Sequence, residues 1–474
     1  MTFRQSLQQL LGLHPGEEAP PGEPLPADDA PALVAALGDP RQHRAAVAGL
    51  QQLGPTAIPA LAAALPAALA TDDPALLRRL VQAAALFNTP ASRQLMVELI
   101  RNENLFARAA ALRATTPRPE PAEAAVFEAV VQRELQLARQ LLHGQATAPA
   151  PLAKALAYEL QGVQSRLFGL LVRLYSPQLI AQAQRTVAHA APERQATALE
   201  LLRHLIPAQV YQGLLTLLDP APAAAKARAF DELLGPPPAA LPPVAELVAV
   251  QGLAAFADWT LAQALQTWKP TATTVKALLP HLRAQNRLVR ESAVAALRRL
   301  AETQPIVHKA LLHHWPHAAP PFPMLPNSDS ARVSAAERVR ILQHTALFAE
   351  TPEHVLSAIV PIMNEVEFAA DEEIFAKGDQ GGSLFIVHEG TVGIYNGEQQ
   401  LTTFEAGDFF GELALLDAEP RSATARALEP VMALRLDQDD FYDVMGDRPE
   451  VLRNILRVLC QRLRHQNDKM QAMA

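Results

Sequence analysis

The residues best suited to chemistry in this chain lie in one short run, residues 410–424, which reads FGELALLDAEPRSAT. Its pattern predicts a tight turn that opens a short helix, with Glu412 and Arg421 nine residues apart. A phosphate is bound well by three features together: backbone N–H groups, a glycine that lets the chain come close (here Gly411), and a guanidinium that donates two hydrogen bonds to its oxygen atoms. Because a phosphate repels a carboxylate, Glu412 must face a hydroxyl, such as the 2'-OH of a ribose. The run therefore predicts a nucleotide ligand rather than bare phosphate.

Short strands are expected to position this run. Eight of the 21 glycines fall within the 34 residues from Gly378 to Gly411, and β-rich pieces lie between and after them. The predicted strands are 373–375, 384–388, 391–395, 401–404, 423–427 and 431–436. Such spacing predicts a small antiparallel barrel or roll. Ser334 and Glu337 form a capping-box pattern that opens an entry helix, and 449–470 has the leucine spacing of a long exit helix.

The same region carries a family resemblance. Gly-Glu-Leu-Ala-Leu, a spacer and Pro-Arg-Ser-Ala-Thr together resemble the phosphate-binding cassette of cyclic nucleotide-binding domains. Such domains occur in the protein kinase A regulatory subunit, cyclic-nucleotide-gated channels and the bacterial catabolite activator. The likeness extends over about residues 335 to 470 and includes 377–379, 384–390 and 406–408.

The resemblance implies roles for single residues. Gly411 and Ala414 match backbone positions that line the phosphate, Glu412 matches the ribose ligand, and Arg421 matches the phosphate ligand. The alternative interpretation of Arg421 is a solvated surface charge without a binding role. The predicted ligand-binding set is Gly411, Glu412, Leu413, Ala414, Arg421, Ser422 and Ala423.

The residues around the base are open to two interpretations. Arg462 aligns with a base-contacting position of gated channels, and Gln466 and Asn467 align with the adenine-contacting pair of the catabolite activator. All three would equally suit the solvated face of an exposed helix. Ile394 and Phe404 could wall the base or belong simply to the core.

The resemblance implies a regulatory ligand, cAMP or cGMP, and no other cofactor. Ser422 departs from the alanine of many cAMP sites and from the threonine of cGMP sites. The similar bacterial activator also has Arg-Ser-Ala, which favours cAMP. No metal is assigned, because His308, His313, His314 and His317 lack the carboxylate or cysteine company of a closed zinc site.

The upstream sequence reads as one helix after another, separated by turn residues. The pair 278–282 and 289–297 resembles a HEAT repeat, and long helices are expected at 122–142 and 152–175. Helix pairs too alanine-rich to bury a core alone can gain one by stacking on neighbours. The predicted fold is therefore multidomain, an all-α HEAT-like solenoid followed by a cyclic nucleotide-binding β-roll with flanking helices. The expected segments are a poorly ordered lead-in (1–30), the solenoid (31–315), a proline-rich linker (316–330) and the nucleotide-binding domain (331–470).

Charge argues against nucleic acid as a partner. Residues 346–445 hold 20 Asp and Glu against four Lys and Arg, a balance of −16, and subtracting this from the whole-chain −8 leaves +8 elsewhere. An acidic roll would repel nucleic acid over a Debye length of about 8 to 10 Å. No helix-turn-helix pattern follows the exit helix, so direct regulation of DNA is not expected.

Composition predicts a soluble protein of a reducing compartment, the cytoplasm. The single cysteine, Cys460, excludes a disulfide framework, and neither a secretory signal nor an uninterrupted apolar stretch of about 18 residues is found. No nucleophile elbow, P-loop, paired carboxylates or CxxC is evident, so the chain is not expected to be an enzyme.

These observations predict a bacterial cyclic nucleotide sensor that acts in signal transduction, with ligand binding changing helix positions and the protein interactions of the scaffold. The domain order resembles the soluble tail of some bacterial transporters similar to nucleotide translocases. That resemblance implies a membrane transporter as partner, reached from the inner face of the membrane without direct insertion. The main alternative is a constitutive interaction scaffold whose roll no longer binds nucleotide. A third interpretation, an enzyme of the HEAT-like lyase type, would need acid or base residues on a concave surface.

Overall fold

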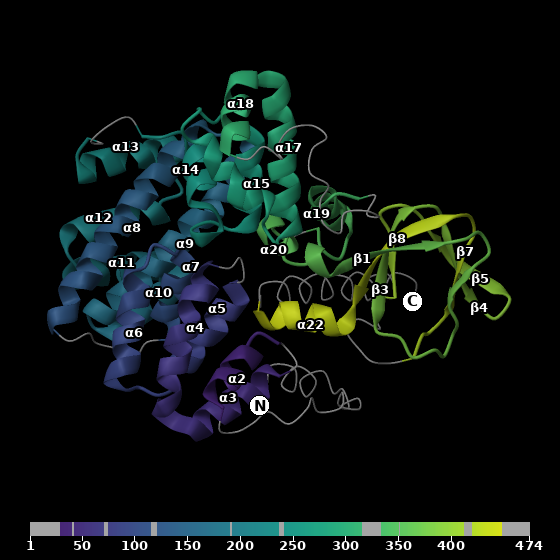
Figure 1. Cartoon of the computed structure of the whole chain (residues 1–474), viewed down its shortest axis with the longest axis horizontal. Coiled ribbons are helices and arrows are strands. Elements are labelled where there is room, and N and C mark those ends of the chain that lie inside the picture. Colours follow the sequence, from purple (N-terminus) through teal and green to yellow (C-terminus); the bar gives the residue numbers. More distant parts are fainter. Residues whose placement is uncertain are drawn as a thin grey trace. The chain divides into compact units, whose positions relative to one another are not determined.

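The chain folds as two units that are described here separately (Figure 1). The computed structural model describes residues 29–39, 42–70, 74–114, 121–189, 192–236, 241–314, 333–349, 351–411 and 420–447. Described residues up to 314 form the helical unit, and those from 333 onward form the C-terminal unit. The predicted linker at 316–330 and nearly all of the predicted lead-in at 1–30 lie outside the described residues.

The helical unit contains α-helices joined by short turns, and proline stands at or beside several helix starts, as in α6 and α9. Short 3-10 helices also occur at Gly54–Ala57 (η1), Gly252–Ala254 (η2) and Val275–Ala277 (η3). The α-helices are α2 (Ala30–Ala36), α3 (His43–Leu53), α4 (Ile58–Ala70), α5 (Pro74–Ala85), α6 (Pro90–Arg101), α7 (Leu105–Ala114), α8 (Pro121–Thr147), α9 (Ala150–Leu174), α10 (Pro177–His189), α11 (Pro192–Leu205), α12 (Ala208–Leu218), α13 (Ala223–Leu234), α14 (Val244–Gln251), α15 (Asp258–Thr267), α16 (Leu278–Leu282), α17 (Arg287–Thr303) and α18 (Pro305–His314).

Neighbouring helices pack on one another in sequence order. Contacts join α2 with α3, α4 with α5, α6 with α7, α8 with α9, and so on to α16 with α17. The long helices expected at 122–142 and 152–175 are α8 and α9. The helical character of this part is thus confirmed, whereas its HEAT-type solenoid arrangement stays a prediction.

A buried charge cluster ties three of these helices together. Glu134 on α8 is fully buried, and its Oε1 accepts hydrogen bonds from Arg108 Nη1 of α7 at 2.6 Å and from Arg166 Nε of α9 at 2.9 Å. Arg108 also donates to the carbonyl oxygens of Ile100 and Asn102. Removing the carboxylate would leave two buried cations without a counter-charge, so the cluster fixes how α7, α8 and α9 meet.

One described stretch, Ala45–Ala70, is long and apolar enough to cross a membrane when judged by length and composition alone. It comprises most of α3, then η1 and α4, and Gly54 between the helices adopts a φ of +67°. Leu50, Leu61 and Leu65 in this stretch are buried. Core helices of soluble proteins pass the same test, so the stretch is weak evidence for a membrane span.

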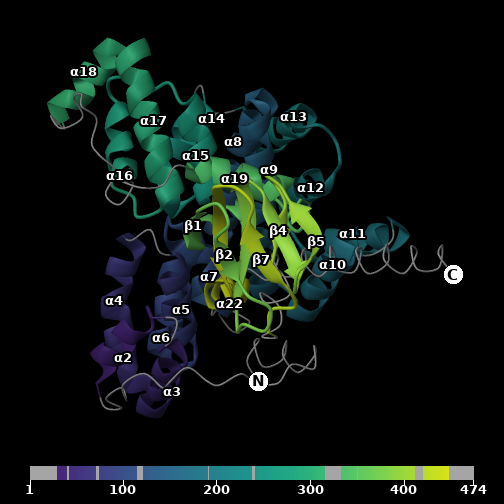
Figure 2. The ribbon, with the colours of Figure 1, turned by 90° about the vertical axis from the view of Figure 1, so that its right-hand side faces the viewer.

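The C-terminal unit is a roll of two four-stranded antiparallel sheets with short helices at its ends. One sheet has the order β1-β8-β3-β6, and the other has the order β2-β7-β4-β5, whose strands lie side by side in Figure 2. The strands are β1 (Met363–Phe368), β2 (Glu373–Phe375), β3 (Ser383–Glu389), β4 (Val392–Asn396), β5 (Gln399–Phe404), β6 (Phe409–Phe410), β7 (Thr424–Ala427) and β8 (Val431–Asp437). The flanking elements are α19 (Ala335–His344), α20 (Glu353–Leu356), η5 (Val360–Ile362) and α22 (Gln438–Asp447).

The predicted roll is confirmed, and all six predicted strands occur within two residues of their expected bounds. The entry helix begins as expected, because Ser334 caps α19 by accepting a hydrogen bond from the Glu337 N–H at 3.2 Å. Sequence analysis missed two strands. In β1 the polar residues interrupt the apolar ones, so no strand pattern is evident, and β6 has only two residues. The predicted exit helix at 449–470, with Cys460, lies outside the described residues.

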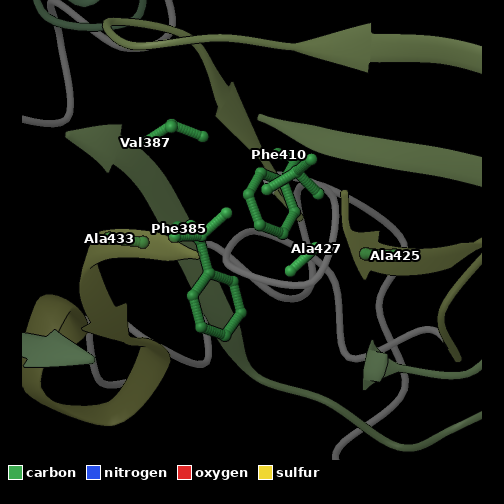
Figure 3. Packing of buried hydrophobic residues seen from close by; sticks show 8 residues of the cluster. Phe385, Val387, Phe410, Ala425, Ala427 and Ala433 are labelled. Carbon is green, nitrogen blue, oxygen red and sulfur yellow. The ribbon is translucent and has the colours of Figure 1, made fainter. Parts of the chain in front are cut away.

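Aromatic and small apolar side chains fill the space between the two sheets (Figure 3). Phe385 of β3 and Phe410 of β6 pair across the strands and stack with ring centroids 5.2 Å apart. This pairing brings the start of β3 next to the end of β6. It thereby brings the loop 376–382 and Gly411, which are far apart in the sequence, to one edge of the roll.

Candidate functional site

Arg421 lies at that edge, and its main chain and side chain both hold the loop before β3. Its N–H donates to Asp379 O at 2.9 Å, and its own carbonyl oxygen accepts from the Gly378 N–H at 2.8 Å. Its Nη1 donates to the carbonyl oxygens of Ser383 at 2.9 Å and Gly411 at 3.4 Å. The guanidinium is therefore fixed between the β2–β3 loop, the end of β6 and the residues that lead into β7.

An aromatic face supports the guanidinium from β2. The Arg421 Cζ lies 4.2 Å from the centroid of the Phe375 ring, within the range of a cation–π contact. Phe375 packs in turn against Phe385 and Phe410 of the core. The cation is thus anchored on the same aromatic cluster that holds the two sheets together.

Two glycines leave room for this side chain. A Cβ at Gly381 would lie 2.4 Å from Arg421 Nε, and one at Gly411 would lie 2.7 Å from Nη1. Gly411 also adopts a φ of +78°, which disfavours any residue with a Cβ. The sequence predicted that a glycine would allow close approach, and the side chain that makes this approach in the structure is Arg421.

No carboxylate in the described part of the chain pairs with the charge on Arg421. Its side chain is only 8% exposed, and within the described ranges no acid forms an ion pair with it. Burial lowers the pKa of the guanidinium, and the charge of nearby Asp379 acts in the opposite direction. Since an arginine stays protonated even so, a buried cation remains whose acceptors among the described residues are neutral carbonyl oxygens. Such a group can gain a charge-assisted hydrogen bond from an incoming anion.

The other predicted site residues fall into three groups. Ser422 is exposed and Ala423 is half-buried beside Arg421, so the structure brings them together with Gly411. Ile394 and Phe404 are half-buried and pack against the core cluster, and Phe404 stacks on Phe410, which agrees with the core interpretation. The predicted residues that lie outside the described ranges are Glu412, Leu413, Ala414, Arg462, Gln466 and Asn467.

Sequence analysis missed three contributors to this site. Phe375 was recognised only as part of a strand, and the position of its ring under Arg421 depends on the pairing of β2 with β7. Ser383 contributes a backbone carbonyl, which leaves no mark in a sequence. Gly381 lies in a glycine-rich loop. The glycines predicted a turn there, but not that Gly381 leaves space for the Arg421 side chain.

Comparison with known proteins bears on what this edge binds. Residues 365–448 match the family model described as "Cyclic nucleotide-binding domain". The C-terminal unit contains a cyclic nucleotide-binding domain. The matched residues include β2 to β8, all of the Arg421 contacts and the whole of α22.

Curated relatives match the same part of the chain. A CRP-like cAMP-activated global transcriptional regulator of Mycobacterium tuberculosis is 32% identical over 135 residues, which are 27% of this chain and 60% of that protein. A cAMP-dependent protein kinase regulatory subunit of Emericella nidulans is 29% identical over 126 residues, which are 25% of this chain and 31% of that protein. The chain therefore spans less than two thirds of either relative.

Solved structures match a similar share of this chain. The N-terminal domain of a transcriptional regulator from Streptomyces coelicolor is 33% identical, with 27% of this chain and 94% of that chain covered and a TM-score of 0.27. The regulatory domain of Toxoplasma gondii PKA, crystallised with cAMP, is 31% identical, with 24% and 45% covered and a TM-score of 0.23.

Proposed function

We propose that this protein is a regulatory sensor of a cyclic nucleotide, cAMP, which binds to the C-terminal roll. The observation that carries the proposal is Arg421, a buried cation that pairs with no acid of the described residues and is held between two glycines inside the matched domain. A cyclic phosphate would supply the missing negative charge. Nη1 already contacts two carbonyl oxygens, and Nε and Nη2 have no acceptor within the described residues, so they can turn to phosphate oxygens.

The remaining contacts of the nucleotide are proposed from the family resemblance. Glu412 would accept a hydrogen bond from the ribose 2'-OH, and Ser422, exposed beside Arg421, would reach the phosphate or the base. Arg462, Gln466 and Asn467 are the proposed base contacts. The names of the curated relatives mention cAMP, and Ser422 follows the Arg-Ser-Ala pattern of the catabolite activator, so cAMP is the proposed purine nucleotide.

A hydrogen-bonded route leads from Arg421 to the helix after the roll. Ser383 accepts from Arg421 through its carbonyl oxygen, and its Oγ donates to Asp437 Oδ1 at 2.6 Å. The N–H of Gln438, the first residue of α22, donates to Gly382 O at 2.7 Å. We propose that a phosphate competes with Ser383 and Gly411 for the guanidinium, and that the resulting shift of 381–383 repositions α22.

The helical unit would carry the response to other proteins. We propose that its helix pairs form a HEAT-like scaffold in the cytoplasm that binds a protein partner, a membrane transporter being the candidate, without catalysing a reaction. Binding of cAMP would then change how the partner is held.

The experiment that tests the proposal is isothermal titration of the full chain with cAMP, cGMP and, as the non-cyclic control, 5'-AMP. Saturable binding of cAMP, with weaker binding of cGMP and little heat from 5'-AMP, is the expected result. Saturable binding of cGMP in preference to cAMP would support the proposed sensor function but contradict cAMP as its ligand. Absence of binding by all three would favour a constitutive interaction scaffold.

A further inference from the structure

The helical unit has an open, solvent-accessible cavity of about 470 Å³ where five helices meet. It lies between the end of α8, the starts of α9 and α14, the end of α15 and one side of α17. Figures 1 and 2 both show α14, α15 and α17 next to one another. Cavities that bind small molecules usually measure about 300 to 1,000 Å³. The size therefore fits a small organic ligand.

The walls of the cavity are mainly apolar. Leu152 and Val244 line it from α9 and α14, and the largely buried Trp268 lines it from the end of α15. Gly144 allows this arrangement, because a Cβ there would lie 2.4 Å from the Val244 side chain. A ligand in this space would bury an apolar body against these three side chains.

The charges that line the cavity are all positive. Arg299 and Lys269 line it, and none of the other lining residues is acidic. Arg299 donates through Nη2 to Leu265 O at 2.6 Å and forms no ion pair in the part of the chain that the structure describes. Burial also lowers the pKa of this guanidinium. An anion in the cavity would meet two cations and no competing carboxylate.

Two helix starts add to the positive character. The N-caps of α9 and α14 are Pro149 and Pro243, which line the cavity and give no side-chain acceptor to the first-turn N–H groups. The ends of α8 and α15 carry the opposite partial charge, but hydroxyl groups of Thr147 and Thr267 already donate to carbonyl oxygens there. The balance of partial charges thus favours a negatively charged group.

One donor of a lining residue has no acceptor among the described residues. Trp268 is 2% exposed, and its Nε1 is buried without a hydrogen-bond partner there. An unpaired buried donor is unfavourable, so a ligand oxygen that reached Nε1 after a small movement of the wall would relieve the penalty.

We propose that this cavity binds a small organic acid whose carboxylate pairs with Arg299 and whose apolar body lies against Leu152, Val244 and the Trp268 ring. The site belongs to the helical unit and uses none of the residues of the nucleotide-binding domain. It would give the scaffold a ligand of its own, separate from the cyclic nucleotide.

The test is calorimetric titration of the full chain with octanoate and, as the uncharged match, octanol. Octanoate should bind saturably and at least about tenfold more tightly than octanol, because only octanoate carries the charge that Arg299 pairs with. Equal affinity of the two compounds would overturn the anion site and leave only an apolar cavity. Absence of saturable binding by octanoate would reject the ligand class.

Substitutions of lining residues test whether octanoate binds in this cavity. Arg299→Gln should weaken octanoate binding about tenfold or more, whereas Arg298→Gln, an exposed neighbour on α17 that does not line the cavity, should change it less than about twofold. Trp268→Phe should also weaken binding, because it removes the Nε1 donor and part of the apolar wall, and thermal unfolding records what the smaller ring costs in packing. Wild-type octanoate affinity in both Arg299→Gln and Trp268→Phe would contradict the proposal, and circular dichroism would verify that each variant is folded.

Discussion

The helical unit and the roll both bury arginine, but they treat its charge differently. Arg108 and Arg166 in the helical unit share the carboxylate of Glu134, so their charges are compensated inside the protein. Arg421 in the roll contacts carbonyl oxygens and the Phe375 ring, and no acid among the described residues pairs with it. The first arrangement is complete without a ligand, whereas the second, as far as the structure describes it, leaves a positive charge for an anion to neutralise.

Lack of an acid partner is not sufficient by itself to mark an anion site. Arg173 is also buried, its pKa is lowered by burial, and it donates to the carbonyl oxygen of Leu112. What distinguishes Arg421 is the pair of glycines that clears space at its guanidinium and its position in a matched nucleotide-binding domain. A buried cation therefore indicates an anion site only when there is also space beside it for the anion.

The largest effect is expected in the helical unit. Glu134→Gln should lower the free energy of unfolding by about 3 to 5 kcal/mol, because it leaves Arg108 and Arg166 buried without their counter-charge. Urea unfolding measures the change. Glu128→Gln, an exposed acid on the same helix, is the matched control and should stay close to wild type. Equal stability of the two variants would show that the cluster does not hold the helices together.

Removing the cation of the roll should affect binding more than stability. Arg421→Ala should lose a charge-assisted contact of about 1.5 to 3 kcal/mol, which weakens cAMP binding roughly ten- to 150-fold. Competition with a fluorescent cyclic nucleotide measures the affinity, and thermal unfolding tests for a loss of fold. Arg426→Ala, an exposed arginine on β7 that contacts Tyr395, is the control and should keep the wild-type affinity. Unchanged cAMP affinity in Arg421→Ala would reject the assigned pocket.

A smaller change is expected from the aromatic support. Phe375→Leu keeps an apolar side chain but loses the ring under Arg421, a contact of about 0.5 to 2 kcal/mol. The same competition assay should therefore show a modest loss of cAMP affinity. Phe368→Leu removes another half-buried ring, one that packs on Phe385, and should leave the affinity unchanged. An equal loss in both variants would make the Phe375 effect one of core packing alone.

The smallest effect concerns a buried acid of the helical unit. Burial raises the pKa of Glu159 above its ordinary 4.5, although the Thr260 hydroxyl and the Ala257 N–H donate to it. The folded protein then holds this proton more tightly than the unfolded chain. The contribution of Glu159 to stability should therefore be largest below pH 4.5 and fall as the pH rises through the raised pKa.

Glu159→Gln should remove this part of the pH dependence, since the amide does not titrate. Urea unfolding of both proteins across acidic to neutral pH measures it, with the exposed Glu98→Gln as control. A pH profile of Glu159→Gln that parallels wild type would show that Glu159 titrates alike in the folded and unfolded states.

The sequence was most informative where local signals and fold agree. Glycine turns and alternating residues predicted six strands of the roll, and Ser334 predicted the start of α19. It was least informative where a residue's role depends on a distant partner. The Glu134 cluster joins residues 26 and 32 positions apart, and no local pattern signals it.

The candidate site shows the same division. Arg421 and Gly411 were predicted from residue type and spacing, and the structure brings them together. Phe375 and the Ser383 carbonyl could not be predicted, because sheet pairing alone places them at the guanidinium. Ile394 and Phe404 illustrate the reverse case, since apolar strand residues suit a base pocket and a core equally well until their packing is known.

The most direct test of the central claim is a structure of the full chain in complex with cAMP. We expect the cyclic phosphate to lie within hydrogen-bonding distance of the Arg421 guanidinium, with the ribose 2'-OH on Glu412 and the contact from Arg421 Nη1 to Ser383 O lengthened or broken. A nucleotide bound elsewhere, or a phosphate that leaves Arg421 on the Ser383 and Gly411 carbonyl oxygens, would contradict the account.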